Sequence, residues 1–322
     1  MTDLRIVVTG GAGFIGSNLV QSLLADHRVK IVRVIDNLSN GYYDNIEEFE
    51  DNSKFEFYND DIRDFDRIVE LTEGFDVISH QAALGSVPRS VENPMLTTEV
   101  NIDGTVNILY AAVKNAIKRV ILACSSSTYG DSRELPKVEE NIGNPLSPYA
   151  ISKYTIELYA QVFKKTFDLD YVGLRYFNVF GPKQNPDNPY AAVIPIFCKS
   201  FIEDRKPIIN GDGETSRDFT YVDNAVQANL KAIFTENKSA LNEIYNVACG
   251  ERTSLNNMIE ILKKVTGKNI HPTYGPERLG DVKHSLADVS KINRLLGYVP
   301  NVLFAEGLEK VYKWYLKNLI NE

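Results

Sequence analysis

The chain has 322 residues, which is long enough for one large domain or two small ones with an ample core. Hydrophobic residues make up 43% of it and charged residues 24%, values typical of soluble globular proteins. The net charge of −8, without a long basic run, disfavours nucleic acid as a partner. Every apolar stretch is shorter than the roughly 18–20 residues of a membrane span, so we expect no membrane segment.

The cysteines and histidines form no disulfide or metal pattern. Cys124, Cys198 and Cys249 lie far apart, and the four histidines lack the spacing of metal ligands. Met1-Thr2-Asp3 leads directly into an apolar run, so we expect no signal peptide. These features favour a reduced, cytoplasmic protein without a structural metal.

A glycine-rich turn follows the first apolar run, residues 4–9, and precedes a segment of helical period, residues 17–24. Its four glycines fit G-x-G-x-x-G or G-x-x-G-x-x-G: Gly10, Gly11, Gly13 and Gly16. Glycine permits a positive φ, lets backbone N–H groups approach a pyrophosphate, and lets the helix pack closely on the strand. The helix N-terminus then presents its partial positive charge to the phosphates. The pattern predicts a dinucleotide site.

A second apolar run, residues 31–35, ends at Asp36, twenty residues beyond Gly16. An acid at this distance accepts hydrogen bonds from the adenosine ribose hydroxyls and repels a 2′-phosphate. We therefore expect NAD rather than NADP.

Strands and helices alternate through the first half of the chain. We expect strands at 54–58, 75–79, 119–124 and 171–175, and helices at 65–72, 95–116 and 147–167. Such alternation predicts a Rossmann-type, doubly wound parallel α/β sheet, in which ligands bind beyond the carboxyl ends of the strands.

The second half begins with a polar, proline-rich loop, residues 180–189, and its segments are shorter. We expect helices at 193–203, 222–235, 254–266, 289–296 and 304–319. The expected division is an NAD-binding domain, 1–178, and a smaller α/β lobe for substrate, 179–322, with some later segments returning to the sheet.

Tyr149 and Lys153 are four residues apart on a predicted helix, so their side chains share one face. A lysine ammonium near a tyrosine favours the phenolate, which can act as a base. The serines at 125–127 end a strand about 24 residues earlier, and a hydroxyl there can bond the reacting oxygen. This combination predicts proton transfer coupled to a nicotinamide.

Five motifs occur in order along the chain: Gly10-x-x-Gly13-x-x-Gly16, Asp61-Ile62, Tyr149-x-x-x-Lys153, residues 175–181 (RYFNVFG) and Arg278-x-Gly280-Asp281. With them the chain resembles the extended short-chain dehydrogenases/reductases, and among these the nucleotide-sugar epimerases. Residues 84–90 and 210–219 resemble most strongly the bacterial UDP-N-acetylglucosamine 4-epimerases, which make precursors of surface polysaccharides.

The resemblance implies the chemistry. Tyr149 would take the proton of the sugar 4-hydroxyl while hydride passes from C4 to NAD, and Lys153 would bind the nicotinamide ribose. Ser125 or Ser126 would hold O4, with Ser127 as a third contact. The 4-keto sugar would then turn about its diphosphate linkage and take the hydride back on its other face.

The resemblance also implies two sets of contacts. The NAD set is Gly10, Gly13, Phe14, Ile15, Gly16, Asp36, Asn37, Ser39, Asn40, Gly41, Asp61, Ile62, Gln81, Ala82, Ala83, Asn101, Tyr149, Lys153 and Tyr176. The substrate set is Gly85, Ser86, Val87, Ser90, Ser125, Ser126, Ser127, Tyr149, Asn178, Ala192, Val193, Asn210, Arg217, Arg278, Asp281 and Ser285. Asn178, Arg217 and Arg278 would grip the diphosphate, because planar guanidinium groups meet phosphate oxygens in pairs. Asp281 would accept from the uridine ribose, with Asn210 and residues 192–194 near the uridine.

Ser285 bears on substrate size. Enzymes of the family restricted to UDP-glucose and UDP-galactose have tyrosine at the matching position, whereas a serine leaves room for an N-acetyl group. Ser86 and Ser90 are small and polar, as suits an amide. The hypothesis is interconversion of UDP-N-acetylglucosamine and UDP-N-acetylgalactosamine.

Other activities of the family stay as alternatives. Dehydratases and decarboxylases need an acid after the hydroxyl residue, where this chain has Ser126 and Ser127, so we disfavour them. A UDP-N-acetylglucosaminuronate 4-epimerase and a UDP-glucose 4-epimerase remain open. A non-catalytic NAD sensor is disfavoured because Tyr149 and Lys153 are present. The resemblance further implies a homodimer through the helices at 95–116 and 147–167, although helices packed on their own sheet show similar apolar stripes.

Overall fold

The computed structural model describes residues 3–187, 192–277 and 283–319. Arg278 and Asp281, two of the predicted substrate contacts, lie outside the described residues. Within the described part of the chain, no helix combines the length and apolar character needed to cross a bilayer.

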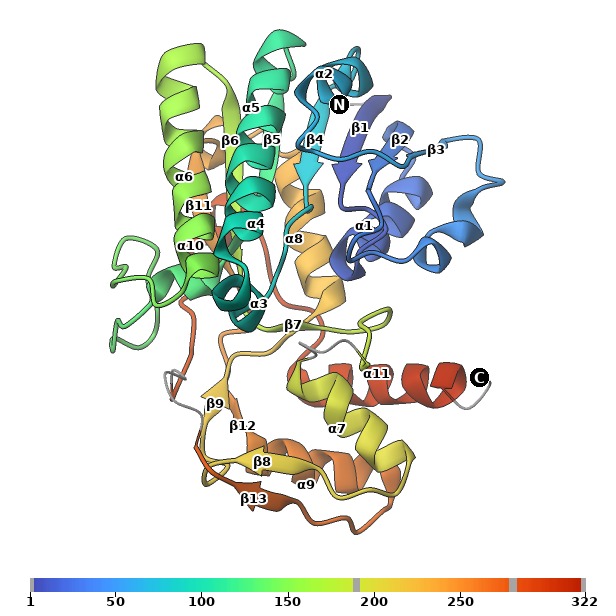
Figure 1. Ribbon diagram of the computed structural model, residues 1–322, viewed down its shortest axis with the longest axis vertical. Helices are drawn as coiled ribbons and strands as arrows, with labels where there is room; N and C mark the ends of the chain where they lie inside the picture. The colour runs from blue at the N-terminus through green and yellow to red at the C-terminus, as the bar shows by residue number, and fades with distance from the viewer. Residues whose placement is uncertain (1–2, 188–191, 278–282, 320–322) are drawn as a thin grey trace.

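A seven-stranded sheet forms the centre of the molecule (Figure 1), and all its neighbouring strands are parallel. In spatial order its strands are β11 (Glu243–Val247), β6 (Asp170–Tyr176), β5 (Arg119–Ser125), β4 (Val77–His80), β1 (Leu4–Thr9), β2 (Val29–Ile35) and β3 (Phe55–Tyr58). The chain order reverses between β1 and β4, as expected of a doubly wound fold. The predicted Rossmann-type sheet is confirmed.

Helices cover both faces of the sheet, which explains why its strands are apolar on both sides. Ile6 and Val8 of β1 belong to one buried cluster, with α1 and α8, whereas Val7 between them belongs to a second, with α2 and α5. The helices are α1 (Phe14–Ala25), α2 (Phe65–Thr72), α3 (Val87–Glu92), α4 (Pro94–Thr98), α5 (Gly104–Lys114), α6 (Pro148–Phe167), α7 (Val193–Ile202), α8 (Val222–Phe234), α9 (Leu255–Thr266), α10 (Ser290–Leu296) and α11 (Phe304–Leu319). These bounds confirm the predicted helices to within a few residues, with one exception.

The exception is the helix predicted over 95–116, which is not one regular α-helix. A π-helical segment, Glu99–Asp103, separates α4 from α5. Gly104 follows it and packs against Ile62, since a Cβ there would lie 2.6 Å from Ile62 Cδ1. Because residue 104 is a glycine, the start of α5 packs closely on Ile62, in the segment that follows β3.

Besides the short strands of the second half, two elements were not predicted at their positions. β11 extends the sheet beside β6, although residues 243–247 lie well beyond the predicted first domain. α3 forms within residues 84–90, and Ser86 caps it by accepting a hydrogen bond from the N–H of Arg89. We keep the division at residue 178 as a proposal, with β11 as a later segment that joins the sheet.

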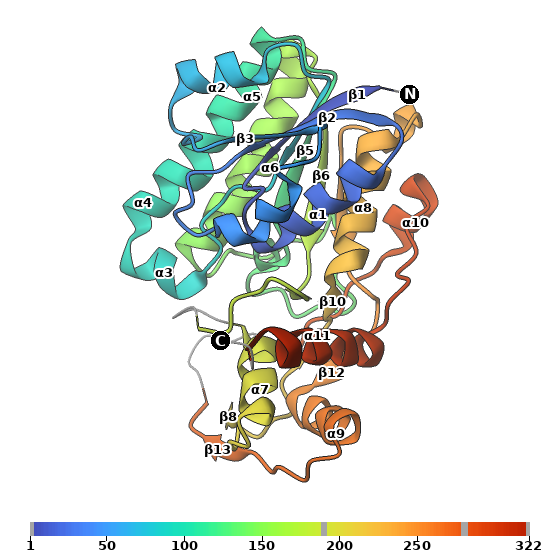
Figure 2. The same cartoon turned by 90° about the vertical axis from the view of Figure 1, so that its right-hand side faces the viewer.

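The remaining segments form a smaller α/β unit beyond the carboxyl ends of the strands (Figure 2). α11 lies between the sheet and the pair α7 and α9, and it contacts both of these helices. Phe304 of α11 packs on Phe180 and Phe219, with ring centroids 5.5 and 5.1 Å apart. These aromatic rings belong to the same buried cluster as Ile6 and Val8 of β1, so the smaller unit packs directly against the sheet domain. The short strands of this unit are β7 (Val179–Phe180), β8 (Ile208–Asn210), β9 (Ser216–Arg217), β10 (Thr220–Tyr221), β12 (Thr253–Ser254) and β13 (Thr273–Gly275).

Candidate active site

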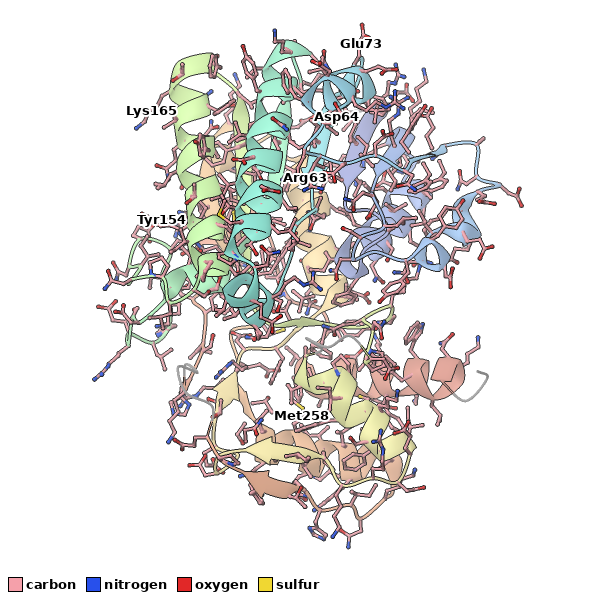
Figure 3. All side chains as sticks on the ribbon, in the orientation of Figure 1. Arg63, Asp64, Glu73, Tyr154, Lys165 and Met258 are labelled. Atoms are coloured by element: carbon pink, nitrogen blue, oxygen red, sulfur yellow. The ribbon has the colours of Figure 1, made fainter. Side chains whose placement is uncertain are left out.

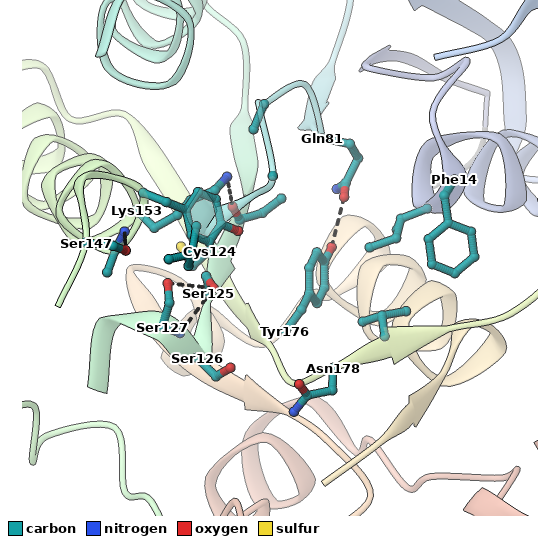
Figure 4. A pocket seen from close by; sticks show the side chains of 18 of the residues that line it. Phe14, Gln81, Cys124, Ser125, Ser126, Ser127, Ser147, Lys153, Tyr176 and Asn178 are labelled. Carbon is teal, nitrogen blue, oxygen red and sulfur yellow. Dashed lines mark hydrogen bonds between the residues drawn. The ribbon is translucent and has the colours of Figure 1, made fainter. Parts of the chain in front are cut away.

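Two adjoining cavities, of about 800 and 310 Å³, lie at the carboxyl ends of the central strands. Gly10, Gly13, Phe14 and Gln81 line both of them. β1, β4, β5 and β6 all end here, so the side chains that follow these four strands converge. Figure 4 shows the larger cavity, with Phe14 on one side and the serines after β5 on the other.

The glycine turn beside both cavities has the backbone conformation and close packing that the sequence predicted. Gly10 has a φ of +69°, and a Cβ on it would lie 2.6 Å from the backbone nitrogen of Ala82. A Cβ on Gly16 would lie 2.1 Å from the carbonyl oxygen of Gly10. No side chain caps the N-terminus of α1, whose N-cap is Gly13, so its first N–H groups are left for a ligand.

Asp36 closes the turn from the side of β2. Its carboxylate accepts hydrogen bonds from the N–H groups of Ala12 (3.0 Å) and Leu38 (2.9 Å). Burial raises the pKa of this carboxyl group, and the two backbone donors oppose the rise. Asp36 thus holds the glycine turn in place and lines the cavity where a ribose would lie.

Asp61 and Asn37 form the far wall of the smaller cavity. Arg63, labelled in Figure 3, donates two hydrogen bonds to Asp61 from its guanidinium group and one from its backbone N–H, and Asn37 donates a fourth of 2.8 Å. Mainly because of Arg63, the pKa of Asp61 is lowered to about 2. Its carboxylate is therefore ionised and fixed in direction at neutral pH.

Most predicted contacts line one or both cavities. The smaller one is lined by Gly10, Gly13, Phe14, Asp36, Asn37, Ser39, Asn40, Gly41, Asp61, Ile62, Gln81, Ala82, Ala83, Gly85 and Ala192. The larger one is lined by Gly10, Gly13, Phe14, Ile15, Gly16, Asn40, Gln81, Ala83, Gly85, Val87, Ser125, Ser126, Ser127, Tyr149, Lys153, Tyr176, Asn178, Arg217 and Ser285. Ala192, expected near the uridine, lies instead on the smaller cavity.

Five predicted contacts line neither cavity: Ser86, Ser90, Asn101, Val193 and Asn210. Asn101 is buried, accepts from the N–H of Leu84 and donates to Leu84 and Ser152, so it anchors the loop after β4 to α6. The hydroxyl of Ser86 caps α3, and that of Ser90 donates to the carbonyl of Val87. These polar groups already have partners inside the protein.

Tyr149 and Lys153 lie in the first half of α6, over the end of β5. Lys153 is buried, and its Nζ donates a 2.7 Å hydrogen bond to the carbonyl of Ala123. Burial lowers its pKa to about 8, and Cys124 and Glu157 oppose this fall. Burial raises the pKa of Tyr149, while a hydrogen bond with Ser125 lowers it. The expectation that Lys153 favours the phenolate of Tyr149 stays a prediction.

The structure distinguishes the serines after β5. Ser125 pairs with Tyr149 and also accepts hydrogen bonds from the N–H and the hydroxyl of Ser127. Ser126 points away from this group, toward Asn178 (Figure 4). Of the two serines that the sequence left open, Ser125 therefore has the geometry to hold a reacting oxygen beside the phenol.

A buried network orients Tyr176 and Gln81 on the opposite wall. The Tyr176 hydroxyl donates to Oε1 of Gln81 (3.1 Å) and accepts from Nδ2 of Asn229 (2.7 Å). Asn229 also accepts from Gln81. It comes from α8 and was not predicted, because one asparagine on a largely apolar helix carries no motif. Lys137 was missed for a similar reason, although it lines the larger cavity from a loop.

Arg217 and Ser285 share one wall although they are far apart in sequence. The N–H of Ser285 donates to the carbonyl of Ser216, the residue before Arg217 in β9. Arg217 in turn donates to the carbonyls of Ser216 and Lys283. Both residues therefore lie on the larger cavity, across from α6.

Comparison with known proteins agrees with this geometry. Residues 6–248 match the NAD dependent epimerase/dehydratase family. A putative UDP-glucose 4-epimerase of Methanocaldococcus jannaschii is 38% identical, over 97% of this chain and 99% of its own. The solved UDP-N-acetylglucosamine 4-epimerase of Methanobrevibacter ruminantium, in complex with UDP-N-acetylmuramic acid, is 40% identical with a TM-score of 0.93, over 99% and 100% of the two chains. The UDP-glucuronic acid 4-epimerase of Bacillus cereus, solved with UDP-glucuronic acid and NAD, is 34% identical with a TM-score of 0.90, over 98% and 100%.

The burial of Lys153 predicts a pH-dependent stability. Because its pKa falls from 10.5 to about 8 on folding, the unfolded chain binds more protons between these values. The free energy of unfolding of the wild type, minus that of Lys153→Met, should therefore rise by up to about 3 kcal/mol from pH 8 to pH 10.5. Urea unfolding across this range measures the difference.

Lys165→Met is the matched control, because Lys165 is exposed on the same helix (Figure 3). Its difference from the wild type should stay flat over the same range. A flat difference for Lys153→Met as well would contradict the buried ammonium.

Proposed function

The chain belongs to the NAD dependent epimerase/dehydratase family, and on this premise we propose that it interconverts UDP-N-acetylglucosamine and UDP-N-acetylgalactosamine. At the coarser level it is an NAD-dependent enzyme of the UDP-sugar 4-epimerase kind. One observation carries the finer proposal: the Tyr149–Ser125 pair and the small side chain of Ser285 line the same cavity.

In the proposed reaction, Ser125 holds O4 of the sugar and the Tyr149 phenolate removes its proton. NAD, when bound, accepts the hydride from C4 and later returns it. The C4–O4 bond becomes a carbonyl, so the proton resides on Tyr149 until O4 takes it back. Asn178 and Arg217 hold the diphosphate while the 4-keto sugar turns its other face to the cofactor.

The glycine turn and Asp36 are proposed to hold the dinucleotide, with Lys153 at the nicotinamide ribose. The ammonium of Lys153 has donors beyond the one used by Ala123, which leaves it able to bond hydroxyls. The positive charge of an oxidised nicotinamide favours the phenolate of Tyr149 by the ordinary effect of an opposite charge. In the absence of that charge, burial opposes the ionisation of Tyr149, because it raises the pKa of the phenol.

The N-acetyl preference rests on Ser285, which lines the larger cavity, whereas Ser86 and Ser90 line neither cavity. A tyrosine at position 285 would fill space beside the sugar that serine leaves open. The relative from M. ruminantium, a UDP-N-acetylglucosamine 4-epimerase, supports this choice, and we extend it to precursors of surface polysaccharides.

A uronic acid epimerase is the second candidate, and Lys137 favours it. This buried lysine lines the larger cavity, and its Nζ donates to the carbonyl of Ser132. No carboxylate of the described residues forms an ion pair with it. The 6-carboxylate of UDP-glucuronate, or of its N-acetylated analogue, would pair with the ammonium of Lys137.

We propose a homodimer formed through α6. Its inner face is buried, yet Ile151, Leu158 and Val162 form a second apolar stripe that is 52, 43 and 53% exposed. Met95 of the adjoining α4 adds to this surface and is 70% exposed. The expectation that these stripes merely face their own sheet therefore does not account for them. Buried free thiols at the three cysteines are compatible with a cytoplasmic location.

Replacing Tyr149 with phenylalanine should lower kcat for UDP-N-acetylglucosamine about 10²–10⁴-fold, because the general base is lost. Tyr154→Phe, on the same helix but outside both cavities, is the matched control and should retain activity. Product formation is followed by NMR, with NAD content measured in parallel. Undiminished turnover by a Tyr149→Phe protein that retains NAD would refute the assignment.

Replacing Ser285 with tyrosine should lower kcat/KM for UDP-N-acetylglucosamine at least tenfold while UDP-glucose turnover is retained, because the ring occupies the acetyl space. UDP-glucose therefore serves as the internal control. A wild type that prefers UDP-glucose would contradict the N-acetyl proposal, and one that prefers a 6-carboxylated sugar would favour the second candidate.

Replacing Leu158 with glutamate should convert a dimer to monomers, because a charge would enter an apolar contact. Sedimentation velocity measures the change. Ile208→Glu is the control, since Ile208 is equally apolar and 64% exposed but lies on β8. A wild type that sediments as a monomer would contradict the dimer.

A further inference from the structure

A buried ion pair lies behind the reacting residues and has no part in the mechanism above. Arg175 of β6 donates two hydrogen bonds to the Glu157 carboxylate, from Nε (2.9 Å) and Nη2 (2.7 Å). The two side chains are 4 and 1% exposed. Glu157 lies four residues beyond Lys153 on α6, so both side chains share one face of the helix.

The remaining nitrogen of Arg175 reaches the segment that follows the catalytic serine. Nη1 donates to the hydroxyl of Tyr129 (3.1 Å) and to the carbonyl of Glu139 (2.9 Å). Tyr129 ends the short helical turn that contains Ser126 and Ser127, and it lines the larger cavity. Arg175 therefore ties this turn to α6 through Glu157.

The network continues from Tyr129 to the wall of the larger cavity that contains Ser285. The Tyr129 hydroxyl donates to Oδ1 of Asn246 (2.6 Å), and Nδ2 of Asn246 donates to the carbonyls of Lys137 and Asp288. The backbone of Lys137 pairs with that of Leu286, next to Ser285. One buried set of hydrogen bonds thus connects Tyr129, at the end of the turn that carries Ser126 and Ser127, with the wall proposed to contact the acetyl group.

Glu157 also acts on the charge of Lys153. From α6, Lys153 is faced by Tyr149 and Glu157, from β5 by Cys124, from β4 by His80, and from β6 by Arg175 beyond Cys124. Burial raises the pKa of Cys124 far above its usual value and lowers that of His80 to about 3, so both are neutral at pH 7. Glu157 is therefore the carboxylate, among the described residues, that opposes the cost of burying the Lys153 ammonium.

Stability alone does not require such a pair. Well-packed apolar residues of similar volume often replace a buried ion pair without loss, because desolvation offsets most of the Coulomb attraction. The hydrogen bonds of this pair, by contrast, connect α6, which carries Tyr149 and Lys153, with the turn after β5.

We propose that Glu157 and Arg175 are positioning residues of the epimerase reaction: their ion pair holds the turn after β5 against α6 and keeps Lys153 charged. The inference rests on the proposed use of Tyr149, Ser125 and Lys153. It assigns neither Glu157 nor Arg175 any contact with sugar or cofactor.

The test removes both charges together, because removal of one would leave its partner buried and unpaired. In the holoenzyme of the double variant Glu157→Gln/Arg175→Gln, kcat should fall about tenfold or more. The high-pH limb of the kcat profile, where Lys153 loses its proton, should move to lower pH, because the carboxylate of Glu157 no longer favours the ammonium and the charge of Arg175 lies farther away, beyond Cys124. NAD content and urea unfolding establish that the variant is folded. A folded double variant with the wild-type kcat and the wild-type limb would overturn the proposal.

A second variant tests the positioning part without altering any charge. Tyr129→Phe removes the hydroxyl that links Arg175 to Asn246, so kcat should fall about tenfold while the high-pH limb stays in place. Unchanged kcat in Tyr129→Phe would overturn the positioning role even if the double variant does not fold.

Glu56→Gln is the matched control for loss of a paired carboxylate. Glu56 pairs with Arg33 between β3 and β2, at the far edge of the sheet, and its variant should keep kcat and the limb. All variants are assayed with whichever UDP-sugar the wild type epimerises. Failure of UDP-N-acetylglucosamine as a substrate would therefore contradict the proposed function, whereas only the ratio of variant to wild type bears on the ion pair.

Discussion

The hydrogen bond from the buried ammonium of Lys153 to the carbonyl of Ala123 fixes the catalytic helix to the strand that ends in Ser125. Together with the Glu157–Arg175 ion pair, this contact holds α6 over the ends of β5 and β6, where Tyr149 lies beside Ser125. The bond also has a cost, because the ammonium lies where burial lowers its pKa to about 8. The protein thus buries an ammonium group at a cost in free energy, and groups with such perturbed pKa values cluster at functional sites.

The parallel register of the sheet brings the other groups to the same point. Ser125 pairs with Tyr176 across β5 and β6, and Thr9 pairs with His80 across β1 and β4. Because all these strands run in one direction, the residues after each strand enter a common space, and the glycine turn after β1 opens that space to phosphates. The dinucleotide half of the site therefore follows almost entirely from strand order.

The sheet and the cofactor could be predicted from the sequence because their signals are local. A glycine turn between a strand and a helix, an acid after the second strand, and two residues four apart on one helix each report a geometry fixed within a few residues. Other features depend on contacts that no local pattern reports. The hydroxyls of Ser86 and Ser90 bond within α3, a helix whose six residues gave no periodic signal, so their use by a substrate stays a prediction. The position of β11 was not predicted because a short edge strand is defined by its pairing with β6. Likewise, the link that Asn101 makes between the loop after β4 and α6 depends on partners in two other segments.

In the proposed function, chemistry and substrate choice are carried by different parts of the chain. Tyr149, Lys153 and Ser125 belong to elements packed within the sheet layer, whereas the backbone of Ser285 bonds to Ser216 in the smaller unit. A change of side chain at position 285 alters the volume beside the sugar without touching α6 or β5. Solved relatives of 34–40% identity, with TM-scores of 0.90 and 0.93, are named for different sugars on one scaffold, as this separation would allow. The buried network through Asn246 then matters because it links the turn after β5 to the segment beside Ser285, the two regions to which the proposal assigns reaction and selection.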